Sequence, residues 1–141
     1  MSSYGVTFAH KLIQRGDYAE AVEAAARHQA QDPESSEPLF DRARALSGLC
    51  RYEEAVAAFE QALKLDREEQ ILPESELDDS VFTTLVAWAQ SLPQSASSAE
   101  RAAILLRYAQ LLPDGTHGQE ADEWLRRVRG ELSTTWVKPR D

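Results

Sequence analysis

The sequence predicts an all-helical protein built from repeated helix-turn-helix hairpins, and three observations lead to this prediction. The chain has 141 residues, and it is rich in Ala, Leu, Glu, Arg and Gln, which lose little side-chain freedom in a helix. A short motif recurs at an offset of 34 residues, a spacing typical of two-helix repeats. Apolar residues also recur at helical spacing within each predicted helix.

The repeated motif marks a turn followed by the start of a helix. Residues 16–22 read Gly-Asp-Tyr-Ala-Glu-Ala-Val, and residues 50–56 read Cys-Arg-Tyr-Glu-Glu-Ala-Val. The last alanine of each motif, Ala21 or Ala55, is expected where the two helices of a hairpin approach closely. Asp32, followed by proline, is expected to end the first hairpin, because proline disfavours helical geometry in the residue before it.

The second hairpin carries large and small residues at fixed positions along both helices. They are Leu39, Ala43, Leu46, Tyr52, Ala55, Phe59, Ala62 and Leu65. This pattern resembles the tetratricopeptide repeat family, which the period of 34 residues also fits. The resemblance implies a right-handed superhelical array of hairpins (a solenoid). A buried stripe is expected along Leu46, Leu49, Val56, Phe59 and Leu63.

We expect one domain over residues 1–133, followed by a flexible tail over 133–141. Ser98 is the expected N-cap of the second helix in the third hairpin. The last helix is expected to cap the array, because a repeat array needs its final apolar face covered. The predicted parts are repeat 1 (2–35), repeat 2 (36–69), an acidic insertion (70–78), a degenerate repeat 3 (79–114) and a capping helix (118–132).

Charge and composition argue against several classes of function. The formal charge is −9, which disfavours binding to a phosphate backbone, so no nucleic-acid partner is expected. No run of about 18 apolar residues occurs, so no membrane insertion is expected. The single cysteine, Cys50, cannot form an internal disulfide, which favours a reducing, cytoplasmic location. No phosphate loop, metal motif or catalytic constellation is recognisable, so we expect no cofactor, no metal and no enzymatic activity.

The resemblance implies a concave groove lined by the first helix of each repeat, where a partner would bind. Phe40 is either an anchor for that partner or part of the packing against the first repeat. Some family members clamp a terminal carboxylate in this groove, but Val6, His10 and Asp41 occupy the corresponding positions and argue against that role. The predicted partner-binding residues are Val6, His10, Ile13, Gln14, Phe40, Asp41, Arg44, Ser47, Thr83 and Thr84.

Three functions stay open at this point. The first is an adaptor or assembly factor that binds a peptide or helix of another protein in the groove. The second is a small acidic chaperone of the secretion type, which would shield a hydrophobic client; an extra helix before the first repeat is not expected. The third is a self-assembling structural subunit, a homo-oligomer in which Trp124, exposed on the edge of the 118–132 helix, packs on another copy.

Overall fold

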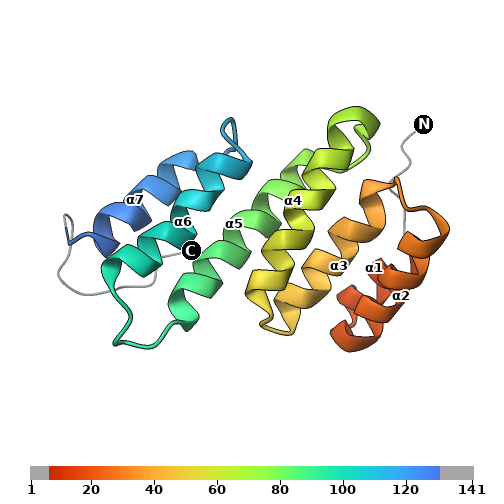
Figure 1. The fold of residues 1–141 in the computed structure, drawn as a ribbon, viewed down its shortest axis with the longest axis horizontal. Helices are drawn as coiled ribbons and strands as arrows, with labels where there is room; N and C mark the ends of the chain where they lie inside the picture. Colours follow the sequence, from red (N-terminus) through yellow and green to blue (C-terminus); the bar gives the residue numbers. More distant parts are fainter. Residues whose placement is uncertain (1–6, 131–141) are drawn as a thin grey trace. The chain divides into compact units, whose positions relative to one another are not determined.

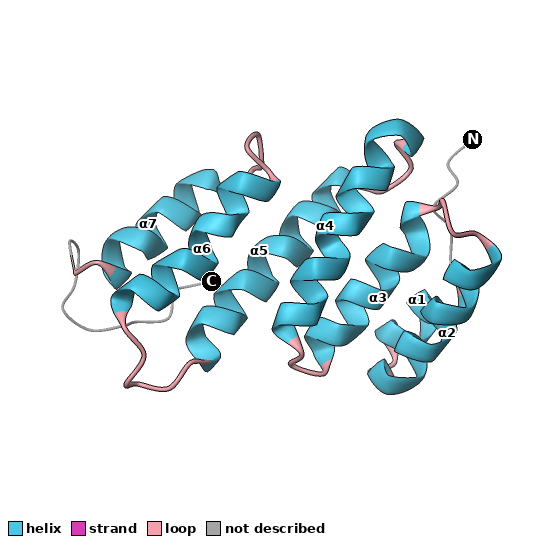
Figure 2. Ribbon diagram, viewed as in Figure 1, coloured by secondary structure: helices cyan, strands magenta, loops and turns pink. Residues whose placement is uncertain are grey.

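The computed structural model describes residues 7–130. All regular secondary structure in this range is helical, which confirms the predicted all-α class (Figure 1, Figure 2). Within each part of the chain, short turns or loops join successive helices that run antiparallel. The helices are α1 (Phe8–Gln14), α2 (Tyr18–Gln31), α3 (Ser36–Gly48), α4 (Tyr52–Glu69), α5 (Glu74–Ser91), α6 (Ser98–Leu111) and α7 (Gly118–Val128).

The chain divides into two compact units, unit 1 (Met1–Leu77) and unit 2 (Asp78–Asp141). In unit 1, α3 packs against α2 and α4, and α1 packs against α2 and α3. In unit 2, α6 packs against α7. The boundary falls inside α5, just after its first turn. The single domain predicted over 1–133 stays a prediction, and the predicted tail lies outside the described residues.

Each of the first two hairpins turns on a residue in the left-handed region. Gly16 has φ 81° and Cys50, at the equivalent position, has φ 62°. In the first hairpin the N–H of Asp17 donates to the Leu12 carbonyl at 2.9 Å, and the same bond recurs from Arg51 in the second, also at 2.9 Å. These bonds satisfy carbonyls that the end of a helix leaves without partners. The shared geometry explains why the motif repeats at a fixed offset.

Small residues let the helices of unit 1 approach closely around a few large ones. Ala21, Ala55 and Phe59 are each 0% exposed. The Phe59 ring packs against Phe40, with ring centroids 6.2 Å apart and planes tilted by 54°. Of the predicted stripe, Leu46, Val56 and Phe59 are buried, Leu63 is half-buried and Leu49 is exposed. Leu49 follows the end of α3 and immediately precedes the left-handed turn residue, which takes it out of the stripe.

Replacing Phe59 with alanine should lower the free energy of unfolding by about 3–5 kcal/mol, because the ring is enclosed and a cavity would remain. The matched control is Phe8→Ala, since Phe8 is 61% exposed and its loss should cost no more than about 0.5 kcal/mol. Urea denaturation followed by circular dichroism measures both. A loss below about 1 kcal/mol for Phe59→Ala would contradict the enclosure of this ring in the core.

The end of α3 carries a glycine because the ring of Tyr18 lies directly against it. A Cβ built on Gly48 would lie 2.5 Å from the Cδ1 atom of Tyr18, which is closer than any real contact. The tyrosine that opens α2 therefore packs on the last turn of α3, in the following hairpin. Gly118, at the start of α7, has no atom within 4 Å of such a Cβ.

Gly48→Ala should therefore destabilise the protein by about 1–3 kcal/mol, the usual cost of overpacking. Gly118→Ala makes the same chemical change in open space and should raise stability by up to about 1 kcal/mol, since alanine favours helix. Thermal melts of the two variants separate steric conflict from helix propensity. Equal shifts of the melting midpoint would show that the Tyr18 ring can move aside without a loss of stability.

The predicted acidic insertion over 70–78 is only partly a loop, because α5 begins at Glu74. The Pro73 carbonyl accepts the N–H of Leu77 at 3.0 Å, so proline stands just before the helix, where its missing N–H costs nothing. Glu74 and Glu76 lie in the first turn of α5, where carboxylates are favoured by the helix dipole. Some of the acidic residues that led to the prediction of a loop therefore belong to the first turn of a helix.

The remaining loop is held by Asp66, near the end of α4. Its Oδ1 atom accepts the N–H groups of Ile71 at 2.8 Å and Leu72 at 3.0 Å. The Oε1 atom of Glu69 accepts both the N–H and the hydroxyl of Ser36, each at 2.7 Å. The carboxylates of Asp66 and Glu69 therefore hold backbone groups of unit 1 in place and are not simply solvated.

Two helix ends in unit 2 differ from the predicted ones. Helix α6 is capped by Ser97, one residue before the predicted Ser98. The Ser97 hydroxyl accepts the N–H of Glu100 at 3.1 Å, and the Glu100 carboxylate accepts the N–H of Ser97 at 3.2 Å. This reciprocal pair is a capping box. Helix α7 ends at Val128, earlier than the predicted residue 132, because the left-handed Gly130 (φ 80°) closes it.

Candidate partner-binding surface

Apart from Val6, the predicted groove residues of the first two hairpins come from α1 and α3, which pack against each other. Equivalent positions of the two repeats meet: Thr7 contacts Asp41 and His10 contacts Arg44, each pair 34 residues apart. In these two pairs, residues that occupy equivalent positions in successive repeats are in direct contact. We define the α1–α3 surface as the predicted residues of these helices that keep some exposure, namely His10, Ile13, Gln14, Arg44 and Ser47.

Two predicted contact residues of α3 are enclosed and do not belong to this surface. Phe40 is 0% exposed and its ring packs on Phe59 of the same hairpin, so it is enclosed and offers no exposed anchor. Its predicted packing against the first repeat stays a prediction. Asp41 is also 0% exposed, and its Oδ2 atom accepts the hydroxyl of Thr7 at 2.8 Å. Val6 lies outside the described residues.

Arg44 is the central charged group of the α1–α3 surface, with 18% of its side chain exposed. Its Nη1 atom lies 3.0 Å from Nδ1 of His10 and 3.8 Å from Oδ1 of Asp41. Its guanidinium carbon lies 5.3 Å from the centroid of the Phe40 ring, within range of a cation–π contact. Because a guanidinium only donates, Nδ1 of His10 must accept. The arginine therefore stabilises the buried Asp41 charge and is held in one orientation.

The third set of predicted contact residues lies on α5, and its two members differ in burial. Thr83 is exposed, whereas Thr84 is 2% exposed. These residues belong to unit 2. Thr84 is therefore removed from the predicted contact residues, and a role for Thr83 stays a prediction.

Unit 2 contains a buried polar network that the sequence analysis missed, centred on Asp78. Its carboxylate accepts the Tyr108 hydroxyl, the N–H of Thr116 at 2.6 Å and the hydroxyl of Thr116 at 2.8 Å. Burial alone would raise the pKa of Asp78, but these hydrogen bonds outweigh burial and hold the pKa below its usual value. Burial and the bond to Asp78 raise the pKa of Tyr108. The carboxylate is thus committed to joining α5, α6 and the loop before α7.

His117 extends this network toward solvent. Its ring stacks on Phe82, with centroids 4.5 Å apart and planes within 3°. Its Nδ1 atom lies 2.6 Å from Glu120, and its Nε2 atom lies 2.7 Å from Asp79. Its separation from Asp79, 38 residues, matches no repeat spacing that could have indicated the contact.

The His117 contacts predict a pH dependence of stability. Burial would lower the pKa of His117, but the hydrogen bonds to Asp79 and Glu120, with the charge of Asp78 nearby, outweigh it and raise the pKa above its usual value. A raised folded-state pKa means that the charged imidazole stabilises the fold below the unfolded-state pKa. That contribution is lost as the pH rises through the folded-state value. The wild-type chain should therefore be more stable than His117→Gln at acidic pH, by a margin that shrinks as pH increases.

Urea melts of the two proteins between about pH 5.5 and 8.5 measure this margin. Combining Asp79→Asn with Glu120→Gln removes both charged acceptors and should flatten the same dependence. A margin that stays constant, or grows with pH, would contradict a charge-assisted role for His117.

Two absences bear on other classes of site. Among residues 7–130, no group of three or more His, Cys, Asp or Glu side chains is arranged to hold a metal ion. Within the same range, the structure contains no helix with both the length and the apolar character needed to cross a bilayer.

Trp124 does not form the exposed edge that the self-assembly hypothesis required. Its side chain is 1% exposed. Ala121, Leu125 and Val128 are buried on the same helix, which spaces them as one apolar face. The indole is therefore part of the unit 2 core, and the prediction of an exposed Trp124 was wrong.

Comparison with known proteins identifies the repeats. A sequence profile of the tetratricopeptide repeat matches residues 12–72, a range that lies within unit 1 and takes in most of its two hairpins. The chain matches no curated protein. Tetratricopeptide repeats are in general protein–protein interaction modules and typically non-enzymatic. Residues 12–72 therefore match the tetratricopeptide repeat family.

Proposed function

We propose that this chain is a non-enzymatic adaptor or assembly factor that binds a peptide or helix of a partner protein on the α1–α3 surface. The proposal rests chiefly on the contact between His10 and Arg44, which holds an imidazole and a guanidinium in fixed orientation. Preorganised side chains lose little freedom when a partner binds. Together with the free thiol of Cys50, this role suits a reducing, cytoplasmic compartment.

The groups around Arg44 favour a peptide over a small molecule. Gln14 and Ser47 can each donate and accept a hydrogen bond, and Ile13 offers apolar area at the edge of the core. Such a mixture suits a segment held partly by its backbone and partly by side-chain contacts. The partner side chain that reaches Arg44 would carry an acceptor, since the guanidinium can only donate.

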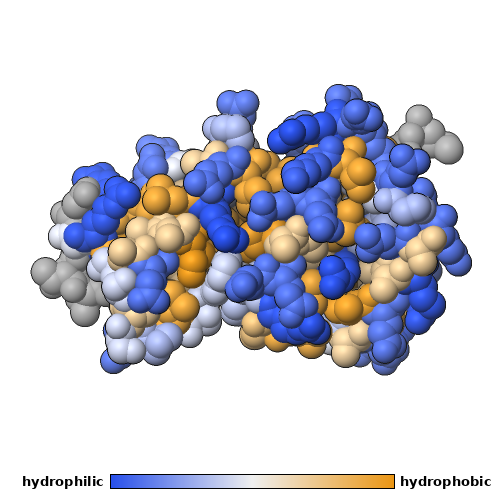
Figure 3. Space-filling model, in the orientation of Figure 1, coloured by the Kyte–Doolittle hydropathy of each residue, from blue (hydrophilic) through white to orange (hydrophobic). Residues whose placement is uncertain are grey.

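The chaperone alternative requires an extended apolar surface for its client. Hydrophilic side chains cover most of the face drawn in Figure 3, with apolar ones scattered between them. Among residues 7–130, the exposed large hydrophobic side chains are Phe8, Leu49 and Leu106. Phe8 and Leu49 belong to unit 1 and Leu106 to unit 2, so the adaptor is the better-supported reading.

Blocking the α1–α3 surface tests the proposal. The double variant Gln14→Arg with Ser47→Arg adds bulk and charge to that surface, and it should abolish capture of a stoichiometric partner in an affinity pull-down. A second double variant, Gln31→Arg with Gln61→Arg, makes the same charge change on α2 and α4, at two exposed positions. It should retain the partner. Phe40 is unsuitable for this test, because truncating an enclosed ring would unfold the hairpin.

Circular dichroism melts establish that both variants are folded, and mass determination of the eluted complex gives its composition. Equal capture by the two double variants would move the site away from the α1–α3 surface. Recovery of only further copies of the chain would favour a self-assembling subunit. A hydrophobic client retained by both variants would favour the chaperone.

A further inference from the structure

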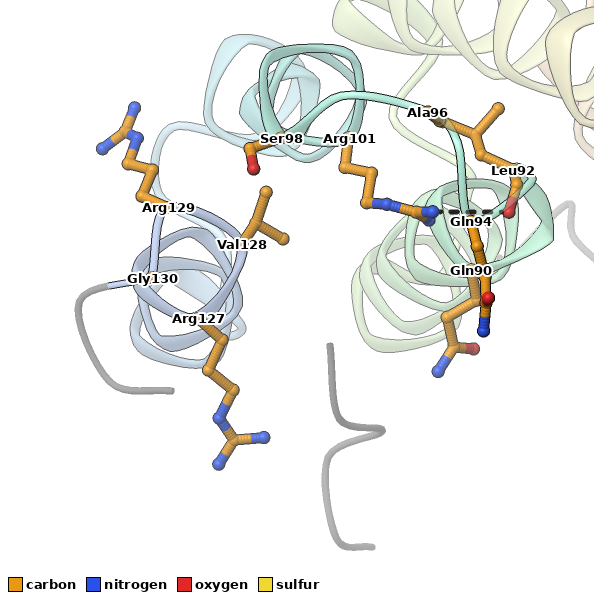
Figure 4. A pocket seen from close by; sticks show the side chains of 10 residues that line it. All are labelled: Gln90, Leu92, Gln94, Ala96, Ser98, Arg101, Arg127, Val128, Arg129 and Gly130. Carbon is orange, nitrogen blue, oxygen red and sulfur yellow. Dashed lines mark hydrogen bonds between the residues drawn. The ribbon is translucent and has the colours of Figure 1, made fainter. Parts of the chain in front are cut away.

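Unit 2 contains a cavity of about 650 Å³, which we call the α5–α7 pocket. Its walls come from the C-terminal end of α5, the loop between α5 and α6, the start of α6 and the C-terminal end of α7 (Figure 4). Its size is within the range of sites that hold small ligands or short peptide segments. All of its lining residues belong to unit 2, so it shares no residue with the α1–α3 surface.

Arg101 forms part of the inner wall and satisfies the end of α5. Its Nη1 atom donates to the Ala89 carbonyl at 2.6 Å, and its Nη2 atom donates to the Pro93 carbonyl at 2.7 Å. The residue is 8% exposed. The carbonyl end of a helix carries partial negative charge and repels anions. Because Arg101 occupies these carbonyls, that repulsion is offset on the α5 side of the pocket.

The opening of the pocket presents a guanidinium on one side and two amides on the other. Figure 4 shows the side chain of Arg127 extending from α7 along the open side, with Gln90 and Gln94 extending from the opposite wall. Arg129 points away from the cavity. The lining contains no Asp or Glu, and within residues 7–130 no carboxylate pairs with Arg127. Val128 supplies apolar surface between the two walls.

We propose that the α5–α7 pocket binds an acidic segment of a partner peptide. A carboxylate of the peptide pairs with Arg127, and backbone amides of the peptide pair with the side chains of Gln90 and Gln94. The planar guanidinium matches a carboxylate with two parallel hydrogen bonds. A glutamine side chain both donates and accepts, so it can pair with the N–H and C=O groups of an extended backbone. The pocket would thus recognise one carboxylate and one stretch of backbone of the bound peptide.

The electrostatic attraction proposed for this pocket acts only at short range. The chain carries a net charge of −9, which repels an acidic peptide at long range. At physiological salt such repulsion is screened beyond about 8 Å. Attraction to Arg127 therefore operates only for a segment that has entered the pocket, and binding should weaken as salt increases.

The test uses the full chain labelled with nitrogen-15 and a capped peptide, acetyl-Gly-Glu-Glu-Gly-amide. Titration should shift the side-chain amide signals of Gln90 and Gln94. Arg127→Glu should weaken the apparent Kd at least about tenfold, and Arg127→Lys should weaken it less, because lysine keeps the charge without the fork. Lys64→Glu, an exposed charge reversal on α4 in unit 1, should bind as the wild type does. Dispersed backbone spectra show that each variant is folded.

Several results would overturn the proposal. They are no shift at either glutamine, equal binding of the neutral peptide acetyl-Gly-Gln-Gln-Gly-amide, and equal weakening by Lys64→Glu, which would reduce the effect to net charge. Inorganic phosphate producing the same shifts would reduce the site to a general anion pocket. The Gln14→Arg/Ser47→Arg variant should bind the acidic peptide normally, so failure here and failure of the α1–α3 surface are distinguishable.

Discussion

The left-handed turn at the end of the first helix in each hairpin is the constraint on which unit 1 depends. Gly16 and Cys50 adopt positive φ values, which reverse the chain within a few residues and bring the second helix back along the first. The enclosed alanines, Ala21 and Ala55, permit that close return. With both hairpins folded alike, equivalent positions of α1 and α3 come into contact. The α1–α3 surface is a consequence of this repetition.

Each unit also contains a buried carboxylate that ties separate segments together. In unit 1, Asp41 accepts from Thr7 and lies near Arg44; in unit 2, Asp78 accepts from Tyr108 and Thr116. A buried charge is costly unless hydrogen bonds replace its hydration. Because these bonds are directional, each carboxylate favours one arrangement of its neighbours. Both groups are better suited to fixing structure than to proton transfer, since their lone pairs are already engaged.

The charges of this acidic chain are organised by position. Asp66 and Glu69 hold backbone near the end of α4, while Glu74 and Glu76 lie at the start of α5. Basic side chains gather instead in the last turn of α7, where cations favour the helix dipole. The same placement that stabilises the end of α7 sets Arg127 at the opening of the α5–α7 pocket. Local helix stability and the proposed recognition of an acidic segment therefore have one physical origin.

The sequence by itself determined the features that depend on neighbours along the chain. The offset between Tyr18 and Tyr52 predicted two hairpins, and the structure starts α2 and α4 at those tyrosines. Gly16 and the Asp32-Pro33 exit marked helix ends, because local sterics control turns. Five of the predicted contact residues of the first two hairpins, His10, Ile13, Gln14, Arg44 and Ser47, keep some exposure.

Only the tertiary structure decided which helix faces are covered and which distant polar groups meet. Helical periodicity places Phe40 and Trp124 each on a defined face, but a neighbouring segment must pack there before the face is buried. The contact of His117 with Asp79 joins segments with no repeat relation, so no spacing could reveal it. Likewise, the pocket beside Arg127 is formed by two stretches, 90–101 and 127–130, that are separate in the sequence. Burial and long-range hydrogen bonding are properties of the packed chain, and local pattern does not encode them.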